Sequence, residues 1–312
     1  MKAIVYDRYG SADELYLTDL PKPTPGRKEV LVHTRAISMN PRDVVFRKGG
    51  LKPLTGFKFP KLTGSDVSGI VEAVGPGVTR FKPGDAVFGY TQDLVRAVSA
   101  EYVNLPEKYL ARKPESISHS QAACLGCAYL TAMQGLRDKA DLKAGQKVLV
   151  YGASGGVGTA VIQLGKHMGA EITAVSNSRN RDHCLQLGAD EFIAYDQEDV
   201  FAMGRKYDVF YQVYSDRGLY YQQAKRILPR HGTFITLIPN PLFEFRRIMA
   251  RPRFEYIMVK TRPQELEELA HLTAQGILSP YISKQLRLEE MAEAHRLVQK
   301  GHTLGKIVVR NI

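Results

Sequence analysis

Residues 147–158 constrain the fold of this chain more than any other segment. A short apolar stretch with strong β-propensity, Lys147–Tyr151, comes first, and a segment with helical character follows the glycines. Between them the sequence reads Gly152-Ala153-Ser154-Gly155-Gly156-Val157-Gly158. The spacing of Ala153, Gly155 and Gly158 is that of the G-x-G-x-x-G fingerprint, with alanine in place of the first glycine. The pattern therefore predicts a strand, a tight turn and a helix whose free N–H groups bind the pyrophosphate of a dinucleotide.

Strands and helices alternate on both sides of this motif. The predicted strands are Lys147–Tyr151, Glu171–Val175, Glu191–Tyr195, Tyr207–Tyr214 and Thr233–Ile238. The predicted helices are Ser118–Leu136, Gly158–Met168, Asp182–Leu187 and Leu219–Leu228, the first of them opened by a Ser118/Gln121 capping box. Because helices supply the crossovers that parallel strands need, we predict an α/β, doubly wound Rossmann domain at residues 118–258.

The first third of the chain has a different character. Short β-rich runs such as Ala3–Tyr6 and Glu29–His33 are separated by turns rich in glycine and proline, which is typical of a barrel or sandwich. After residue 262 two helices, Gln264–Gln275 and Leu288–Lys300, precede a final strand, Lys306–Val309. We expect this strand to rejoin the first domain. That domain would then be discontinuous, residues 1–117 and 259–312, with catalysis in the cleft between the two domains.

Composition excludes several classes of protein. Of 312 residues 44% are hydrophobic and 24% charged, as in a globular protein with a substantial core. The three cysteines are too few for a disulfide framework, which favours a reducing, cytoplasmic location. Charge near residue 1 argues against a signal peptide, and the two uncharged stretches, 116–136 and 148–165, are too polar to span a membrane. The net charge of +11 is scattered, so we interpret it as surface charge plus an anion site rather than a nucleic-acid interface.

The residues after the second predicted strand indicate which dinucleotide is bound. NAD-binding domains usually place Asp or Glu there, against the ribose 2′-hydroxyl. This chain instead has Ser176-Asn177-Ser178-Arg179-Asn180-Arg181. Hydroxyl and guanidinium groups bind a phosphate well, so Ser176, Ser178, Arg179 and Arg181 predict NADP(H). A polar loop with two solvated arginines is the alternative.

Several motifs in one order resemble those of the medium-chain dehydrogenase/reductase superfamily. Beside the fingerprint they are Gly64–Val71, Phe81–Gly89, Ala100–Val103, Leu130–Ala132, Leu187–Asp190 and Gly305–Val308. The resemblance covers essentially the whole chain and implies a GroES-like β-barrel catalytic domain beside the Rossmann domain. Within that superfamily, the chain is similar to the zinc-independent quinone oxidoreductase branch.

The resemblance also bears on metal binding. The positions matching the catalytic cysteine, histidine and second cysteine of zinc-dependent members are Asn40, Ser65 and Cys127. One thiolate cannot hold a tetrahedral zinc ion, so we expect no metal. Without a Lewis acid, alcohol oxidation becomes harder, whereas an electrophilic acceptor can still take a hydride. The expected function is NADPH-dependent reduction of a quinone or an α,β-unsaturated carbonyl.

The family pattern suggests further site residues. Asn40 would donate to the substrate oxygen, or else fix the turn before Pro41; Asp43 is expected to order that turn. Tyr90 would line the substrate cleft, or be a plain loop aromatic. Thr131 would approach the nicotinamide, or bond to its own helix. Tyr195 resembles the family tyrosine near the adenosine phosphate, and Gln212 replaces the usual aspartate.

Three alternatives remain at this point. The protein could be a nucleotide-binding sensor or RNA-binding protein that kept the fold without turnover, or a reductase of acyl-thioesters. The family resemblance implies a homodimer. Residues 240–254, which mix arginines with apolar groups, suggest a lid over the cleft or a patch for anionic lipid, although an ordinary basic helix is the simpler interpretation.

Overall fold

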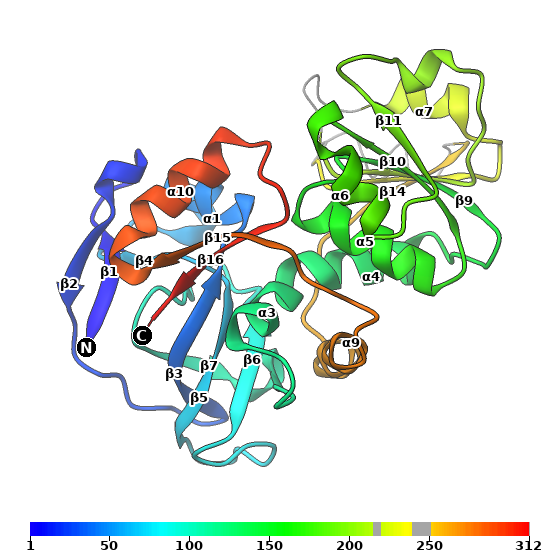
Figure 1. The fold of residues 1–312 in the computed structure, drawn as a ribbon. Coiled ribbons are helices and arrows are strands. Elements are labelled where there is room, and N and C mark those ends of the chain that lie inside the picture. The colour runs from blue at the N-terminus through cyan, green and yellow to red at the C-terminus, as the bar shows by residue number, and fades with distance from the viewer. Residues whose placement is uncertain (215–219, 239–250, 312) are drawn as a thin grey trace. The chain divides into compact units, whose positions relative to one another are not determined.

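The structure, a computed structural model, describes residues 1–214, 220–238 and 251–311. It forms two compact units, which are considered separately below (Figure 1). Unit 1 comprises Met1–Leu130 and Lys260–Ile312, and unit 2 comprises Thr131–Val259. Ser118–Leu130, which the sequence assigns to the dinucleotide domain, belongs to unit 1 because its helix packs against the strands of that unit.

Unit 2 contains a parallel sheet of six strands. The strands are β9 (Lys147–Tyr151), β10 (Glu171–Ser176), β11 (Glu191–Ala194), β12 (Val209–Gln212), β13 (Thr233–Thr236) and β14 (Arg253–Tyr256). Their order across the sheet is β11-β10-β9-β12-β13-β14, and every pairing is parallel. This is the doubly wound Rossmann order, in which the direction of winding reverses between the first and fourth strands, here β9 and β12.

Helices connect these strands. They are α4 (Leu130–Gln134), α5 (Gly156–His167), α6 (Arg181–Gln186) and α7 (Tyr221–Ile227). The helices α5 and α6 lie beside each other along the sheet, against β9, β10 and β11 (Figure 1). Residues 148–150 of β9 are fully buried, as expected for the central strand of a parallel sheet covered on both faces. The predicted Rossmann fold is confirmed, with helix and strand ends shifted by a few residues.

Unit 1 is built from two sheets. A three-stranded sheet has the order β2-β1-β4, and a seven-stranded sheet has the order β15-β16-β3-β5-β6-β8, with β7 paired to β3. The strands are β1 (Lys2–Tyr6), β2 (Tyr16–Asp19), β3 (Glu29–Ser38), β4 (Lys61–Leu62), β5 (Asp66–Val74), β6 (Ala86–Tyr90), β7 (Tyr102–Pro106), β8 (Leu110–Arg112), β15 (Ile282–Arg287) and β16 (Lys306–Arg310). The inward side chains of both sheets share one apolar core, in the manner of a GroES-like barrel.

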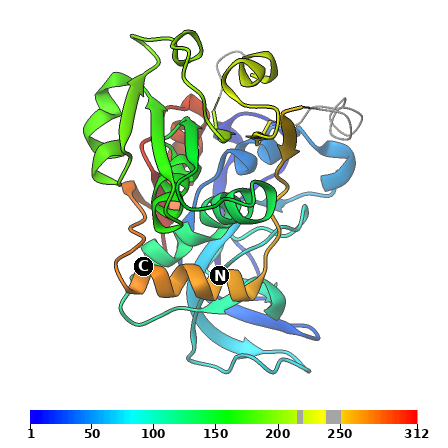
Figure 2. The ribbon, with the colours of Figure 1, turned by 90° about the vertical axis from the view of Figure 1, so that its right-hand side faces the viewer.

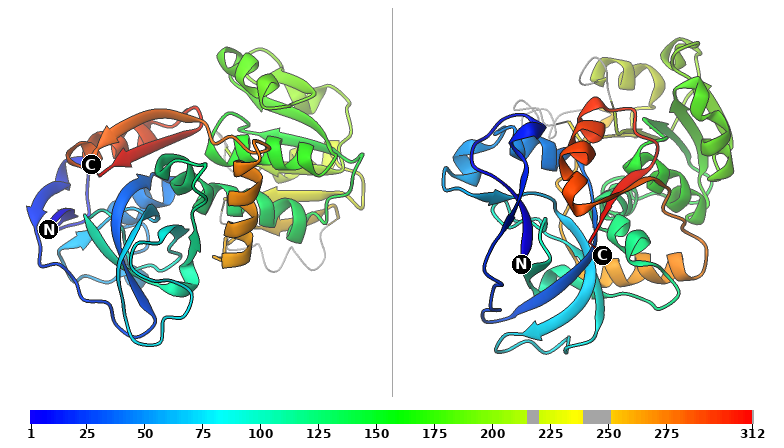
Figure 3. Two further views of the ribbon diagram at one scale, coloured as in Figure 1. Left: turned by 60° about the horizontal axis from the view of Figure 1, so that its bottom comes forward. Right: turned by 60° about the vertical axis from the view of Figure 1, so that its left-hand side comes forward.

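The last strand closes this barrel. Val308 to Arg310 of β16 pair antiparallel with β3, and β15 runs parallel beside β16 (Figure 3). The prediction that the C-terminal strand rejoins the first domain is therefore confirmed, whereas β14 and β15 were not predicted. The helices of unit 1 are α1 (Pro41–Arg47), α2 (Lys52–Thr55), α3 (His119–Cys124), α9 (Pro263–Ala274) and α10 (Met291–Lys300). Of these, α9 packs beside β8 (Figure 2).

The predicted helix from Ser118 to Leu136 is interrupted. Ser118 accepts a hydrogen bond from Gln121 N at 3.2 Å, as a capping box requires, but π-helical turns at Leu125–Tyr129 and Gly135–Lys139 break the α-helical pattern. Most of segment 240–254 lies outside the described residues. Within the described part of the chain, no helix is long and apolar enough to cross a bilayer.

A buried histidine joins the two ends of unit 1. His295 of α10 is fully buried, and its Nδ1 accepts from Arg47 Nε of α1 at 3.3 Å. Its Nε2 lies 3.0 Å from Thr63 Oγ1. Burial, followed by the charge of Arg47, lowers the pKa of His295 to about 3. The imidazole therefore stays neutral in the folded protein at pH 7.

Replacement of His295 should change how stability depends on pH. In the unfolded chain the ordinary pKa is 6.5, so between pH 6.5 and 3 the unfolded state binds one proton more than the folded state. Stability should consequently fall by about 1.4 kcal/mol per unit as pH drops through this range. Urea unfolding between pH 6.5 and 5 should give a slope that is steeper by about 1.4 kcal/mol per pH unit in the parent protein and in His271→Gln, an exposed control, than in His295→Gln, which keeps the contributions of the other buried histidines, such as His119. An identical slope in both variants would contradict the assignment.

Candidate active site

The fingerprint turn lies at the carboxyl end of β9, where the sheet reverses its winding. Helix α5 begins at Gly156 with Gly155 as its N-cap, so no side chain caps its first N–H groups. These groups and the positive end of the helix dipole form an anion-binding site. Dinucleotides bind at this reversal point in doubly wound sheets.

Gly155 and Gly158 of the turn differ in how much space a side chain would have. A Cβ on Gly158 would lie 2.3 Å from Gly152 O, so glycine is required there by the packing of α5 on the turn. A Cβ on Gly155 would meet only Gly152 O, at 3.7 Å, and the φ of Gly155 is −78°, which any residue adopts. No described residue comes close enough to require glycine at position 155. The open space suits the approach of a pyrophosphate, so the residues present fit a dinucleotide.

Ser154 and Ser176 form a buried polar network with Asn180. The two hydroxyl oxygens are 2.7 Å apart, and Asn180 Nδ2 donates to Ser154 Oγ at 3.0 Å and to Ser176 Oγ at 3.2 Å. All three residues are buried. The network fixes the turn after β9 to the loop after β10. The buried Ser176 hydroxyl, which the sequence predicts to bind the 2′-phosphate, is thus engaged within the protein. Asn180 was not predicted because its role depends on Ser154, which is 26 residues away in sequence.

A carboxylate from the loop after β11 contacts the loop after β10, where the sequence itself has no acidic residue. Ser178 N donates to Asp196 Oδ1 at 2.8 Å and its hydroxyl donates to Asp196 Oδ2 at 2.7 Å. The hydrogen bond from Ser178 is the main cause of the lowered pKa of Asp196, and Arg179 lowers it further. The Ser178 hydroxyl is thus engaged with Asp196 rather than turned to a ligand. Asp196 follows β11, one strand beyond the position where the family pattern places the acidic residue.

The remaining residues predicted for this site are spread around it. The Tyr195 ring stacks on Tyr151 with centroids 6.0 Å apart, close to Arg179 and Asp196. The Arg181 guanidinium lies over the Phe192 ring, 5.6 Å from its centroid. Thr131 is nearly buried and its carbonyl accepts from Tyr211 at 2.8 Å. Gln212 Oε1 accepts from Tyr220 N at 3.2 Å, at the end of β12.

Unit 1 holds a buried charged cluster around Asn40. Lys306 Nζ donates to Asn40 Oδ1 at 2.6 Å and to Met39 O at 2.8 Å, and it lies 3.8 Å from Asp66 Oδ2. Asn40 Nδ2 in turn donates to Asp66 Oδ2 at 2.8 Å. Burial raises the pKa of Asp66 to about 6 despite the ammonium. The Asn40 amide therefore holds the cluster together, which favours its structural interpretation over donation to a substrate.

Asp43 orders the turn that precedes α1. Its Oδ2 accepts from Asn40 N and its Oδ1 from the Ser65 hydroxyl, both at 2.8 Å. The carboxylate is fully buried, and burial raises its pKa. Both of its oxygens are thus satisfied within the protein.

Tyr90 and Arg42 form a pair beside this turn. Arg42 Nη1 donates to the Tyr90 hydroxyl, and the guanidinium lies 5.2 Å from the centre of the Tyr90 ring. Burial raises the pKa of Tyr90, so its hydroxyl remains protonated. Arg42 also lines a small hollow of about 30 Å³ together with Phe46 and Leu94. The sequence offered no sign that Arg42 and Tyr90 meet, because they lie on different elements.

The cluster does not fit a zinc ion. Asn40 Oδ1 is bonded to the Lys306 ammonium, and burial raises the pKa of the Cys127 thiol to about 12, so neither side chain is an available anionic ligand. Among the described residues, no group of three or more His, Cys, Asp and Glu side chains could hold a metal ion.

The chain resembles known proteins along its whole length. Residues 26–115 match a family described as alcohol dehydrogenase GroES-like domain, and residues 187–309 match one described as zinc-binding dehydrogenase. The chloroplast envelope quinone oxidoreductase homolog of Arabidopsis thaliana is 33% identical, over 99% of this chain and 98% of its own. This chain belongs to the medium-chain dehydrogenase/reductase superfamily, in its quinone oxidoreductase-like branch.

Two further members support this placement. The NADPH-dependent alkenal/one oxidoreductase of Arabidopsis thaliana is 31% identical over 99% of this chain and 79% of its own length. The structure of the quinone oxidoreductase from Coxiella burnetii is 30% identical, covers 100% of this chain and 99% of that one, and superposes with a TM-score of 0.92.

The two fingerprint glycines should respond differently to alanine. Gly158→Ala should lower the free energy of unfolding by about 1–3 kcal/mol, since the new methyl group meets backbone atoms that cannot move away. Gly155→Ala should lower it by only about 0.5–1 kcal/mol, the cost of alanine in place of glycine at an N-cap. Urea unfolding measures both, and equal losses would contradict the packing described here.

Lys306 should be essential for the stability of unit 1. Lys306→Met leaves Asp66 buried without its cation and should cost about 3–5 kcal/mol. Lys284→Met, at an exposed lysine, is the matched control. The double variant Lys306→Met with Asp66→Asn should recover part of the loss. If Lys306→Met and the control have the same free energy of unfolding in urea, the ion pair does not stabilise unit 1.

Proposed function

We propose that this protein is an NADPH-dependent reductase that transfers a hydride to a quinone or an α,β-unsaturated carbonyl without zinc. The single observation that carries the proposal is the open space at Gly155, before the uncapped start of α5, where none of the residues that the structure describes requires glycine. Two relatives, a quinone oxidoreductase homolog and an NADPH-dependent alkenal/one oxidoreductase, support by their names the choice of acceptor and coenzyme.

The phosphate of NADPH would be bound by the loop after β10. Arg179 is exposed and lies near Tyr195 and Asp196, so its guanidinium is free to turn toward a 2′-phosphate. Arg181, also exposed, begins α6 beside it. Asp196 would oppose a phosphate, but its carboxylate already accepts two hydrogen bonds from Ser178. We therefore assign the preference for NADPH over NADH to the two arginines.

The residues of unit 2 would hold and orient the coenzyme. The first N–H groups of α5 bind the pyrophosphate, and the Ser154–Ser176–Asn180 network keeps the turn rigid. Thr131 is assigned to the nicotinamide side of the site, and Tyr195 to the adenosine side. The nicotinamide, when bound, supplies the hydride.

The residues of unit 1 would stabilise the charge that develops on the acceptor. Hydride addition to an enone or a quinone leaves a negative oxygen, which a zinc ion would otherwise neutralise. We assign this role to the Arg42 guanidinium and the Tyr90 hydroxyl, which are already paired. Leu94 and Val95 are exposed beside Arg42 and would provide apolar contacts for the ring of the acceptor. Asn40 becomes a positioning residue, because its amide is engaged with Lys306 and Asp66.

Partners and location are part of the same proposal. We propose a homodimer formed by edge strands, for which β14 is one of the two edges of the parallel sheet among the described strands, with β11 at the other. We also propose a cytoplasmic location. The names of two relatives place those proteins in chloroplasts.

Steady-state assays separate this proposal from its alternatives. NADPH oxidation should be rapid with 9,10-phenanthrenequinone and with a panel of enones, and unchanged after dialysis against EDTA. Turnover of acyl-thioesters alone would indicate an enoyl reductase. NADPH binding without reduction of any acceptor would indicate a sensor and contradict the proposed activity.

The coenzyme preference can be tested by substitution. Arg179→Ala with Arg181→Ala should raise the KM for NADPH at least about tenfold, because each charge-assisted bond to phosphate contributes about 1.5–3 kcal/mol, and should leave the KM for NADH nearly unchanged. Arg205→Ala, a surface control in the same unit, should change neither. Equal effects on both coenzymes would contradict the assignment of the 2′-phosphate site.

A further inference from the structure

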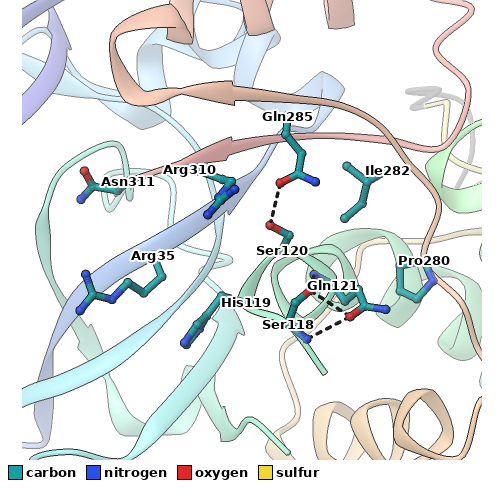
Figure 4. A pocket seen from close by; sticks show the side chains of 10 residues that line it. All are labelled: Arg35, Ser118, His119, Ser120, Gln121, Pro280, Ile282, Gln285, Arg310 and Asn311. Atoms are coloured by element: carbon teal, nitrogen blue, oxygen red, sulfur yellow. Dashed lines mark hydrogen bonds between the residues drawn. The ribbon is translucent and has the colours of Figure 1, made fainter. Parts of the chain in front are cut away.

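Unit 1 contains a second hollow that plays no part in the proposed reaction. It encloses about 660 Å³, within the range of small-molecule binding sites, and lies between α3 and the strands β3, β15 and β16. Arg35, Arg310 and His119 lie on the same side of it (Figure 4). None of the residues that line it is acidic. The two arginines therefore give the lining of the hollow a net positive charge.

The two arginines carry free guanidinium groups. Neither Arg35 nor Arg310 forms an ion pair with any other described residue, and both are at least partly exposed. They come from the antiparallel strands β3 and β16, where Arg310 pairs with Ala36. Side chains that are adjacent in a regular strand point to opposite faces, so Ala36 and Arg35 would normally point apart.

Two β-bulges bring the lining side chains to one face. The register of β3 against β5 slips between Thr34 and Ala36, which makes Arg35 the inserted residue and turns its side chain toward the hollow. The register of β15 against β16 slips in the same way between Ile282 and Lys284. Ile282 and Gln285 are three residues apart and still both line the hollow. Bulges that redirect side chains into one place are typical of binding sites.

His119 adds a hydrogen-bond acceptor to this basic site. Ser68 donates its only hydroxyl hydrogen to Val87 O at 2.9 Å, so His119 Nδ1, 2.7 Å from Ser68 Oγ, must be the donor of that bond. Burial, with the nearby charges of Lys113 and Arg35, lowers the pKa of His119 to about 4. The ring is therefore neutral at pH 7, and Nε2 can only accept a hydrogen bond.

We propose that this hollow binds a small phosphorylated polyol, such as a sugar phosphate, through its phosphate at Arg35 and Arg310 and a hydroxyl at His119. Paired guanidinium groups match the oxygens of a phosphate. The accepting Nε2 and the amide of Gln285 match hydroxyl groups, whereas Ile282 and Pro280 offer a carbon face. The site is independent of the coenzyme turn, because every residue that forms it belongs to unit 1.

Isothermal titration with ribose 5-phosphate tests the proposal. The full chain is titrated with NADP⁺ present in excess, so that the coenzyme turn is occupied. Ribose 5-phosphate should bind, inorganic phosphate more weakly, and ribose not detectably. Arg35→Gln with Arg310→Gln should weaken binding of ribose 5-phosphate at least tenfold, while Lys284→Gln, on β15 but outside the hollow, should change it less than twofold.

Conservative variants guard against misfolding. Arg35→Lys with Arg310→Lys keeps the charge and should retain binding within a few-fold, and thermal unfolding should show all variants folded. Absence of binding, binding that NADP⁺ abolishes, or binding unchanged by the double glutamine variant would each overturn the proposal. So would binding of a single-stranded RNA, lost in that variant, without binding of ribose 5-phosphate. The proposed reductase activity can fail or succeed without altering these outcomes.

Discussion

The bond from the Lys306 ammonium to Asn40 holds together parts of the chain that are more than two hundred residues apart. Lys306 begins β16, Asn40 precedes α1, and Asp66 begins β5. A buried ammonium is tolerated only where acceptors surround it, and here a carbonyl, an amide oxygen and a carboxylate do so. The barrel, the turn before α1 and the placement of Arg42 and Tyr90 all depend on that arrangement. The same bond leaves no room for a metal ion at Asn40.

The sequence predicted the parallel sheet well, because its evidence is local. Lys147–Tyr151 and the start of α5 follow directly from apolar patterning and the glycine spacing. The site in unit 1 could not be predicted in the same way. Asn40 looks like a free amide in a family motif, and only the return of β16 shows that Lys306 and Asp66 engage both of its ends.

Asp196 is a further example of what local reasoning misses. The Ser176–Arg181 segment contains no carboxylate, but Asp196, which follows β11, accepts two hydrogen bonds from Ser178 of that segment. Parallel neighbouring strands end at the same edge of the sheet, so residues of successive loops meet there. The polarity of such a loop is set by the neighbouring loop as much as by its own residues. The two β-bulges around Arg35 and Ser283 have no sequence signature either, since neither contains glycine.

The order of the strands in unit 1 has a consequence for biosynthesis. The ribosome delivers β1 to β8 first, then all of unit 2, and only afterwards β15 and β16. Unit 2 can fold while the barrel still lacks its closing strands. At that stage β7 covers one part of the β3 edge, and Ala36–Ser38 remain unpaired along that edge until β16 is made. A nascent chain at this stage exposes an apolar edge that chaperones can shield until translation has passed Arg310.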